Sequence, residues 1–309
     1  MHPDFENLVF EGGGTKGSAY AGCVEVIEKK GILKSVKRVA GTSAGSITAT
    51  LLACGSGSSG LFDAVRHTDF KKFIDDSWGV IGDAKRTFTK YGMHTGDPLV
   101  KTLKKYIHEL TGDQNLTFSK LRILARSEPS KFKELSVVAS NLTRQQPQIF
   151  SADHSPELQI WESVRASVSI PMIFEPVIIN EEYFVDGSLS WIYPVNIYDL
   201  CETDSESGLE VLVRNPKTLG FYLEPQSIYP TGKKFNPTLF NINSFGTFLM
   251  SMGYYMFESA NYNSMCSEDI KRTVFIDDLG VSATTFSTSE KKIEALIQSG
   301  RKATEEFFS

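Results

Sequence analysis

The chain has 309 residues, of which 41% are hydrophobic and 22% are charged. This composition belongs to a globular protein with a sizeable core and excludes wholesale disorder. The formal net charge of −5, with a pI near 5.7, excludes the basic surface that nucleic-acid binding needs, so any contact with a membrane has to be local and apolar.

The N-terminal residues contain neither the basic start nor the apolar stretch of a secretory signal, which favours a cytoplasmic protein. Cys23, Cys54, Cys201 and Cys266 lie far apart without a C-x-x-C pair, so we expect reduced thiols rather than disulfides or a metal site. The longest uncharged stretch has an apolar part, residues 245–257, that is shorter than the roughly 20 residues of a membrane-spanning helix. We therefore expect peripheral membrane contact at most.

Two strand–turn–helix units open the chain. Residues 7–10 form a short apolar run that is typical of a buried strand, and glycines follow it at once. A helix with one apolar face is predicted next, with its end at Gly31. Residues 36–40 predict a second strand, 41–45 a turn, and 47–54 an apolar helix. This repetition predicts a parallel sheet that is covered on both faces.

The rest of the chain adds an excursion and further strands. A low-complexity connection begins a helical excursion from the sheet, which we expect at about 56–115, and an amphipathic helix at 290–308 closes the chain. Because neither an internal repeat nor a linker is evident, we expect residues 1–309 to form a single domain. Its predicted fold is three-layer α/β, with a mainly parallel central sheet covered by helices on both faces. The later predicted strands are 135–139, 148–150, 177–179, 183–185, 210–213, 219–223 and 274–276.

The turn at residues 41–45 matches the pattern G-x-S-x-G, in which a serine stands on a tight strand-to-helix turn with its hydroxyl exposed. Ser43 is the candidate nucleophile. We expect glycine at Gly41 and Gly45 because side chains two positions away would collide with so tight a turn. The helix that begins at Ala44 would direct unpaired amides toward the charge on a carbonyl oxygen under attack. A plain strand-helix turn with a capping serine is the alternative.

The glycine loop, residues 12–17, matches G-x-G-x-x-G, which is also the pattern of a dinucleotide pyrophosphate site. Such a site needs an acidic residue about 20 positions further on, and residues 36–41 contain none. A phosphate loop of the G-x-x-x-x-G-K-[ST] type is excluded because the lysine precedes the last glycine. We favour an oxyanion hole over a plain helix-entry turn, with the backbone N–H groups of Gly13, Gly14 and Thr15 as donors.

Asp186 is the candidate partner of the serine. A Ser-Asp-His hydrolase needs a histidine, usually late in the chain, but none follows His154, and His94 and His154 are both expected in loops. Asp186 ends a predicted hairpin strand, which puts its carboxylate at a sheet edge. With a pKa near ~3.9 a carboxylate is a poor base, so it has to be desolvated or coupled to oxyanion formation. The positive helix end that favours the oxyanion also favours the ionised form of Asp186 and so weakens it as a base. The alternative is a turn aspartate that caps residues 187 and 188.

Four blocks in this order resemble the patatin-like phospholipase family: the glycine loop, the serine turn, residues 165–171 and the stretch 186–188. The resemblance covers about residues 7–194. It implies a dyad of Ser43 and Asp186, with no metal and no cofactor. It also implies hydrolysis of the fatty acyl esters of phospholipids, lysophospholipids or neutral lipids through an acyl-enzyme.

Two positions depart from the family pattern. Ser188 replaces the usual glycine or alanine, and Glu11 stands where many members carry aspartate. The resemblance further implies lipid in membranes or micelles as the partner, and some members are delivered into another cell and need a protein activator there. The runner-up function is a catalytically silent lipid-binding or interaction protein.

Two segments are hypotheses for contact with lipid. The first is the excursion at 62–112, with basic residues near Trp78, and the second is the apolar stretch 245–257. Core packing of the apolar stretch and a solvated helix face for the basic residues are the alternatives. The basic residues are Lys71, Lys72, Lys85, Arg86 and Lys90.

Overall fold

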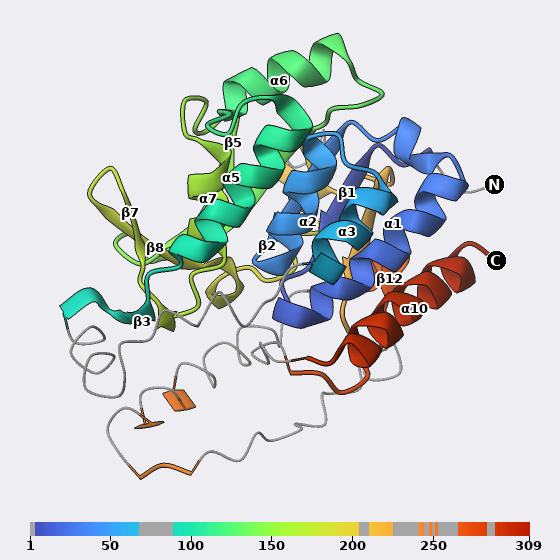
Figure 1. Cartoon of the computed structure of the whole chain (residues 1–309). Coiled ribbons are helices and arrows are strands. Elements are labelled where there is room, and N and C mark those ends of the chain that lie inside the picture. The colour runs from blue at the N-terminus through green and yellow to red at the C-terminus, as the bar shows by residue number, and fades with distance from the viewer. Residues whose placement is uncertain are drawn as a thin grey trace.

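The computed structural model describes residues 4–67, 89–203, 210–224, 241–243, 247–248, 251–252, 265–282 and 288–309. Its centre is an eight-stranded sheet with the path β12-β11-β1-β2-β4-β8-β7, to which β5 adds by pairing with β4 (Figure 1). These strands are β1 (Asn7–Phe10), β2 (Arg38–Thr42), β4 (Glu134–Asn141), β5 (Gln146–Ser151), β7 (Val177–Ile179), β8 (Glu182–Asp186), β11 (Thr218–Tyr222) and β12 (Thr273–Phe275).

The core strands β1, β2, β4, β11 and β12 are parallel, and β5, β7 and β8 join them in antiparallel pairs. Two smaller pairs accompany the sheet. A parallel pair joins β3 (Gly92–His94) to β6 (Met172–Phe174), and an antiparallel hairpin joins β9 (Leu200–Thr203) to β10 (Glu210–Val213).

Two strands share one edge of β4. There β2 pairs in parallel with residues 134–138, and β8 pairs in the antiparallel sense with residues 139–141, while β5 holds the opposite edge. The carboxyl ends of β2 and β8 therefore meet head to head: Thr42 lies opposite Val138, and Asp186 lies opposite Ala139. The chain leaves β2 for Ser43 at this junction.

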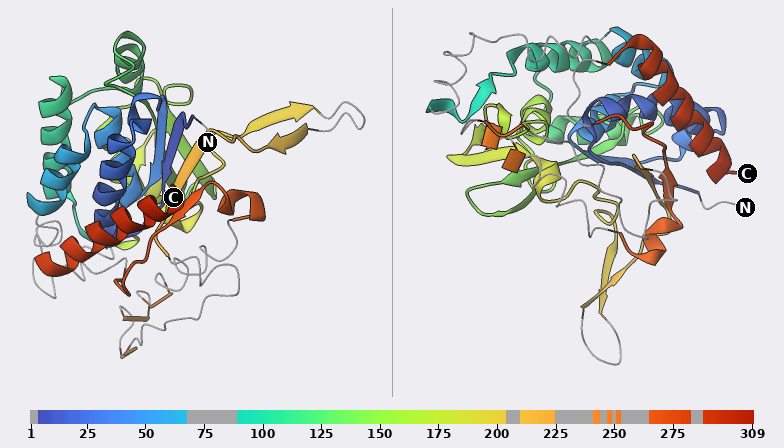
Figure 2. Two further views of the ribbon diagram at one scale, coloured as in Figure 1. Left: turned by 90° about the vertical axis from the view of Figure 1, so that its right-hand side faces the viewer. Right: turned by 90° about the horizontal axis from the view of Figure 1, so that it is seen from below.

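Most helices cover one face of the sheet, as the left panel of Figure 2 shows. On that face α2 contacts β1, β2 and β4, and both α6 and α7 contact β4. The helices are α1 (Ala19–Lys29), α2 (Ala44–Ala53), α3 (Ser58–His67), α5 (Asp97–Thr111), α6 (Phe118–Ser127), α7 (Ile160–Ser167), α9 (Ser267–Ile270) and α10 (Glu290–Phe307), with 3-10 turns η1 (Gly14–Ser18), η2 (Ile32–Lys34) and η4 (Gly187–Leu189).

The opposite face has a thinner cover. A second apolar cluster lies there, in which Val9 and Ala40 of the sheet pack against Tyr193 and Tyr198 of an irregular segment. The β9–β10 hairpin projects on this side of the sheet (Figure 2). The prediction of a three-layer α/β fold with a mainly parallel sheet is confirmed, and one outer layer is largely irregular chain.

The C-terminal helix α10, predicted at 290–308, packs along α1 at close range. Two glycines explain the distance. A Cβ on Gly22 would lie 2.0 Å from the carbonyl oxygen of Ile297, and a Cβ on Gly300 would lie 2.1 Å from that of Ala19. The two backbones therefore touch where neither helix carries a side chain.

Several elements differ from the expectations. The second strand runs to Thr42 rather than ending at residue 40, because Gly41 and Thr42 continue the ladder with β4. The excursion contains the helices α3 and α5, but it also contains the strand β3, which precedes α5. His94 lies on β3 and is buried, so its placement in a loop was wrong. The elements not predicted are β3, β6, β9, α6, α7 and α9.

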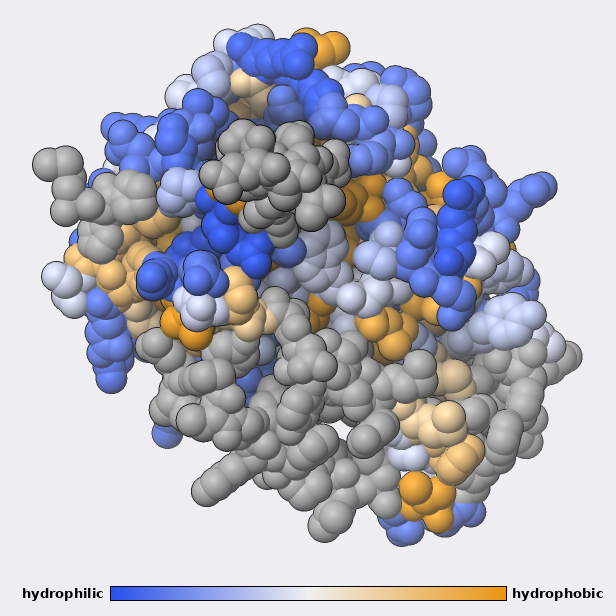
Figure 3. Space-filling model, turned by 180° about the vertical axis from the view of Figure 1, so that it is seen from behind, coloured by the Kyte–Doolittle hydropathy of each residue, from blue (hydrophilic) through white to orange (hydrophobic). Residues whose placement is uncertain are grey.

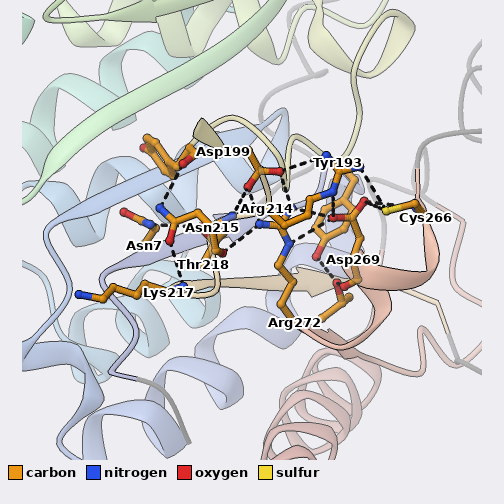
Figure 4. Close-up of polar contacts among 12 residues, drawn as sticks. Asn7, Tyr193, Asp199, Arg214, Asn215, Lys217, Thr218, Cys266, Asp269 and Arg272 are labelled. Carbon is orange, nitrogen blue, oxygen red and sulfur yellow. Dashed lines mark hydrogen bonds and ion pairs between the residues drawn. The ribbon is translucent and has the colours of Figure 1, made fainter. Parts of the chain in front are cut away.

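An ion cluster joins three segments beside the amino ends of β11 and β12 (Figure 4). The guanidinium of Arg272 binds both carboxylate oxygens of Asp199 at 2.5 and 2.8 Å, and it contacts Asp269 at 2.7 Å. Arg214 lies beside the same two carboxylates, and Cys266 donates to Asp269. Burial favours a higher pKa for Asp269, but hydrogen bonds from Arg272 and Cys266 outweigh it and hold that pKa below its ordinary value.

None of the helices in the described ranges combines the length and the apolarity that a bilayer crossing requires. Cys23 and Cys54 are buried free thiols whose pKa burial raises to about 12, and Cys266 is a half-buried free thiol. The Cys201 side chain lies outside the described part.

Candidate active site

The serine turn is strained and crowded. Ser43 has φ 50° and ψ −124°, a conformation that costs a non-glycine residue free energy, and it is only 4% exposed. A Cβ on Gly41 would lie 2.3 Å from the carbonyl of Gly45. A Cβ on Gly45 would lie 2.4 Å from the carbonyl oxygen of Phe10. Both glycines are sites of close backbone approach, Gly41 within the turn and Gly45 against the end of β1, which the turn pattern did not predict.

The head-to-head junction of β2 and β8 brings the serine and the aspartate together. The hydroxyl of Ser43 donates to Oδ2 of Asp186 at 2.7 Å, although the two residues are 143 positions apart. The backbone N–H of Ser188 donates to the other carboxylate oxygen, Oδ1, at 2.8 Å. Both oxygens of Asp186 thus have a donor, and one donor is the candidate nucleophile.

Burial decides the basicity of Asp186. The residue has no solvent exposure, and this burial raises its pKa from 3.8 to about 6, against the opposing hydrogen bonds from Ser43 and Ser188. Desolvation therefore outweighs the groups that favour the ionised form. The carboxylate is a stronger base than an exposed aspartate, and it is still ionised at neutral pH.

The glycine loop lies against the serine. A Cβ on Gly12 would stand 3.2 Å from the Cβ of Ser43, so there is no room for a side chain between them. The backbone N–H of Gly12 donates to the carbonyl of Ile192 at 3.0 Å. Within the described ranges the N–H groups of Gly13 and Gly14 have no acceptor. Gly14 has φ 54°, a left-handed conformation that glycine adopts without strain. Thr15, the third predicted donor, is buried in the η1 turn.

Three contacts hold this loop in place. The carboxylate of Glu11 accepts the backbone N–H of Leu223 at 2.5 Å, and Leu223 packs on Gly13. Lys16 forms an ion pair with Asp278 at 2.6 Å. The loop is thereby attached to the segments that follow β11 and β12. The charges of Glu11 and Lys16 are both used in fixing the loop.

The end of α7 contacts the backbone of both candidate residues. The hydroxyl of Ser167 accepts the N–H of Ser43 at 2.8 Å and donates to the carbonyl of Val138 at 2.6 Å. The carbonyl of Ser169 accepts the N–H of Asp186 at 2.9 Å. The sequence of residues 165–171 indicates only a family resemblance and does not predict these contacts. The signal it contained was a run of small polar residues inside a segment that is otherwise apolar.

The histidines have other surroundings. His154 hydrogen-bonds Ser151 at 2.9 Å, His94 stacks edge-on against Phe174, and His108 is exposed on α5. The Ser43 hydroxyl instead donates to Asp186. No group of three or more His, Cys, Asp or Glu residues that could hold a metal ion occurs among the residues that the structure describes.

Much of the two lipid-contact hypotheses falls outside the described residues, including Trp78, Lys71, Lys72, Lys85 and Arg86. Lys90 is exposed. Of the apolar stretch, Phe248 and Met252 are each 45% exposed, which does not fit core packing at these two positions. Hydrophobic areas border the grey residues in Figure 3.

Comparison with known proteins identifies one family for this chain. The model of the patatin-like phospholipase family matches residues 8–198. An uncharacterized protein of Acanthamoeba polyphaga mimivirus, R571, is 27% identical over 300 residues, which cover 96% of this chain and 92% of the viral protein. A probable lipid hydrolase of Invertebrate iridescent virus 6, 463L, is 24% identical over 62% of this chain and 63% of its own.

The fold also occurs among solved structures. VipD from Legionella pneumophila matches with a TM-score of 0.61 and 18% sequence identity, over 99% of this chain and 67% of VipD. At this identity the match shows that the two proteins share a fold.

Proposed function

Because the chain belongs to the patatin-like phospholipase family, we propose that it is a lipid acyl hydrolase in which Ser43 is the nucleophile and Asp186 the general base. The observation that carries this proposal is the 2.7 Å hydrogen bond from the serine hydroxyl to a fully buried carboxylate. A nucleophile within hydrogen-bond reach of a base is what acyl transfer through a serine requires.

In the acylation step the fatty acyl group passes from the alcohol of the ester to Ser43. The Oγ of Ser43 attacks the ester carbonyl carbon while its proton passes to Oδ2 of Asp186. The C–O bond to the alcohol then breaks, and the departing oxygen takes the proton from Asp186. The fatty acyl group remains on Ser43 as an ester.

The glycine loop stabilises the oxyanion. In this proposal the N–H groups of Gly13 and Gly14, with Thr15 as a third candidate, donate to the oxygen that becomes negative when Ser43 attacks. The start of α2 adds its positive end at the same place. Each lost donor of this kind costs about 3 kcal/mol of transition-state stabilisation.

Deacylation repeats the chemistry with water. Asp186 accepts a proton as the water oxygen attacks the acyl carbon, and Ser43 recovers that proton when the fatty acid leaves. A carboxylate is sufficient as base because burial brings the pKa of Asp186 closer to neutral pH. Asp186 thereby accepts the proton that a histidine accepts in a Ser-Asp-His hydrolase.

The substrates are fatty acyl esters of phospholipids or lysophospholipids, met at the surface of a membrane or micelle by peripheral contact. The family supports this class, and so does the relative named as a probable lipid hydrolase. The reaction proposed here uses groups of the chain itself: the serine, the aspartate and the amides of the glycine loop.

The test uses a fluorophosphonate probe on the parent protein and on Ser43→Ala, in the presence of lipid micelles. Labelling of the parent alone, together with release of fatty acid from phosphatidylcholine or lysophosphatidylcholine, is the expected result. Failure to label either protein would overturn the proposal and favour a catalytically silent lipid-binding protein. Asp186→Asn should lose fatty acid release while retaining its fold.

A further inference from the structure

The backbone N–H of Ser43 finds no acceptor in the strand and the helix that flank it. Its N–H follows the last residue of β2 and precedes the first residue of α2, so it takes part in neither the ladder nor the helix. It is also buried, and a buried N–H group without an acceptor is rare and costly. The acceptor is the hydroxyl of Ser167, which is itself without solvent exposure.

The hydroxyl of Ser167 forms two hydrogen bonds, one as acceptor and one as donor. A serine hydroxyl has one proton to donate and lone pairs to accept. Ser167 accepts from Ser43 N–H and donates to the Val138 carbonyl, so the strained turn is tied to β4 through a single oxygen. Val138 lies at the junction of β2 and β8, and a Cβ on Gly187 would lie 2.3 Å from the same carbonyl.

The other catalytic partner is held from the same segment. Two residues further on, the carbonyl of Ser169 accepts the N–H of Asp186 at 2.9 Å. The last residue of α7 and the segment just after it thus contact the backbones of nucleophile and base together. A shift of either contact would change the separation of the reacting oxygens, on which proton transfer depends steeply.

We infer that Ser167 is a positioning residue for the acyl transfer, because its hydroxyl fixes the backbone of Ser43 relative to β4 and hence to Asp186. This inference deepens the proposed function and rests on it. Ser167 touches no substrate atom. It acts on the orientation of the serine hydroxyl through the strained turn, and its removal slows acylation without weakening substrate binding.

The experiment compares Ser167→Ala with Ser163→Ala, a matched control. Ser163 lies one turn earlier on α7, is equally buried, and donates to the carbonyl of Ile160 at 2.7 Å rather than bonding to Ser43. The measured quantities are kcat and KM for a soluble short-chain ester, the rate of fluorophosphonate labelling, and the melting temperature of each full-length variant.

For Ser167→Ala we expect kcat and the labelling rate to fall by about 10- to 100-fold, in line with the cost of small misplacements, with little change in KM. Ser163→Ala should lower the melting temperature by a similar amount and keep the parent kcat. Ser167→Thr, which keeps the hydroxyl, should recover most of the activity.

Two results would overturn the inference. One is a labelling rate of Ser167→Ala equal to that of the parent, and the other is an equal loss of kcat in both alanine variants. A parent protein that neither reacts with the probe nor releases fatty acid would instead sink the proposed function, so the two failures are told apart.

Discussion

At the scale of single residues, Asp186 behaves unlike most carboxyl groups of this chain. Ion pairs with basic neighbours lower the pKa of Glu25 and Asp153, both of which lie near the surface. Burial without a cationic partner moves the pKa of Asp186 upward instead. The same change makes it a better base and a less stable anion.

The first prediction concerns the pH dependence of activity. Asp186 has to be ionised to accept the serine proton, so kcat/KM should be constant above its pKa of about 6 and fall about tenfold for each pH unit below it. The measurement is a pH series with a soluble ester between pH 4 and pH 8. An activity that shows no acidic limb between pH 4 and 7 would contradict the assignment of the base.

The second prediction concerns stability. Between pH 3.8 and about 6 the folded state keeps a proton on Asp186 that the unfolded state has released, so stability falls as pH rises through this window. Above it the penalty is complete, at about 3 kcal/mol. Asp186→Asn removes the charge and should therefore be more stable than the parent at pH 8.

Urea unfolding at both pH values tests this prediction, because the advantage of Asp186→Asn should disappear near pH 3.5. The asparagine keeps an acceptor for the Ser188 N–H and donates its amide to the Ser43 oxygen, so both hydrogen bonds can form, the one with Ser43 in the reverse direction. An equal or lower stability of the variant at pH 8 would argue against a desolvated carboxylate.

The third prediction concerns Ser188, where the family carries glycine or alanine. Its hydroxyl is buried without a hydrogen-bond partner of normal geometry, yet it is close enough to lower the pKa of Asp186. Ser188→Ala should shift the acidic limb of the pH profile upward while leaving the plateau activity near that of the parent. A downward shift in the same titration would show that the hydroxyl acts in another way.

Sequence reasoning at this scale identifies residue types better than contacts. Ser43 and Asp186 stand out because glycines surround the first and a strand precedes the second. Their meeting depends on β8 occupying the part of the β4 edge that β2 leaves free, and no local pattern encodes that register. Ser167 has no distinguishing pattern, since its role is defined by a long-range hydrogen bond.

At the scale of elements, the crossing of α2 over the end of β1 depends on Gly45. A Cβ there would meet two backbone carbonyls, of Phe10 and Glu11, at 2.4 and 2.5 Å. The fourth prediction is that Gly45→Ala pushes α2 away from β1, lowers the free energy of unfolding by more than about 3 kcal/mol, and disturbs the glycine loop.

Gly57→Ala is the control, because its Cβ would meet only the flexible end of the Glu28 side chain. Urea unfolding and fluorophosphonate labelling should show both losses in Gly45→Ala and neither in Gly57→Ala. Parent-like labelling of Gly45→Ala would mean that the crossing can relax without moving the loop.

The elements that could be predicted are those with long or strongly patterned apolar runs. The parallel strands of the core and α10 belong to this group. In contrast, β3 and β6 are three residues long and pair across about 80 positions, so their local sequences carry too little information. The helix α7 is short and rich in polar residues because its buried serines bond to backbone, which weakens the apolar pattern.

At the scale of the whole molecule, the ion cluster around Arg272 holds together segments that are distant in the sequence, beside the amino ends of β11 and β12. Arg272 and Asp199 are buried, and a buried charge left without its partner is costly. The fifth prediction is that Arg272→Met destabilises the protein by about 3 to 5 kcal/mol.

The exposed pair of Arg66 and Glu294 supplies the control, since Arg66→Met should cost less than about 1 kcal/mol. Chemical denaturation of both variants measures the difference. At a temperature where Arg272→Met remains folded, its Ser43 labelling rate should match that of the parent, because none of the cluster residues contacts the dyad among the described contacts. Equal stabilities of the two variants would mean that the cluster is not a structural tie.

During biosynthesis the meeting point of β2 and β8 forms late. Ser43 leaves the ribosome 143 residues before Asp186, and Leu223, which supports the glycine loop, emerges later still. A nascent chain therefore carries the serine without its base or a fixed loop until residue 223 has been added. The proposed site is thus assembled only from segments that are far apart in the order of synthesis.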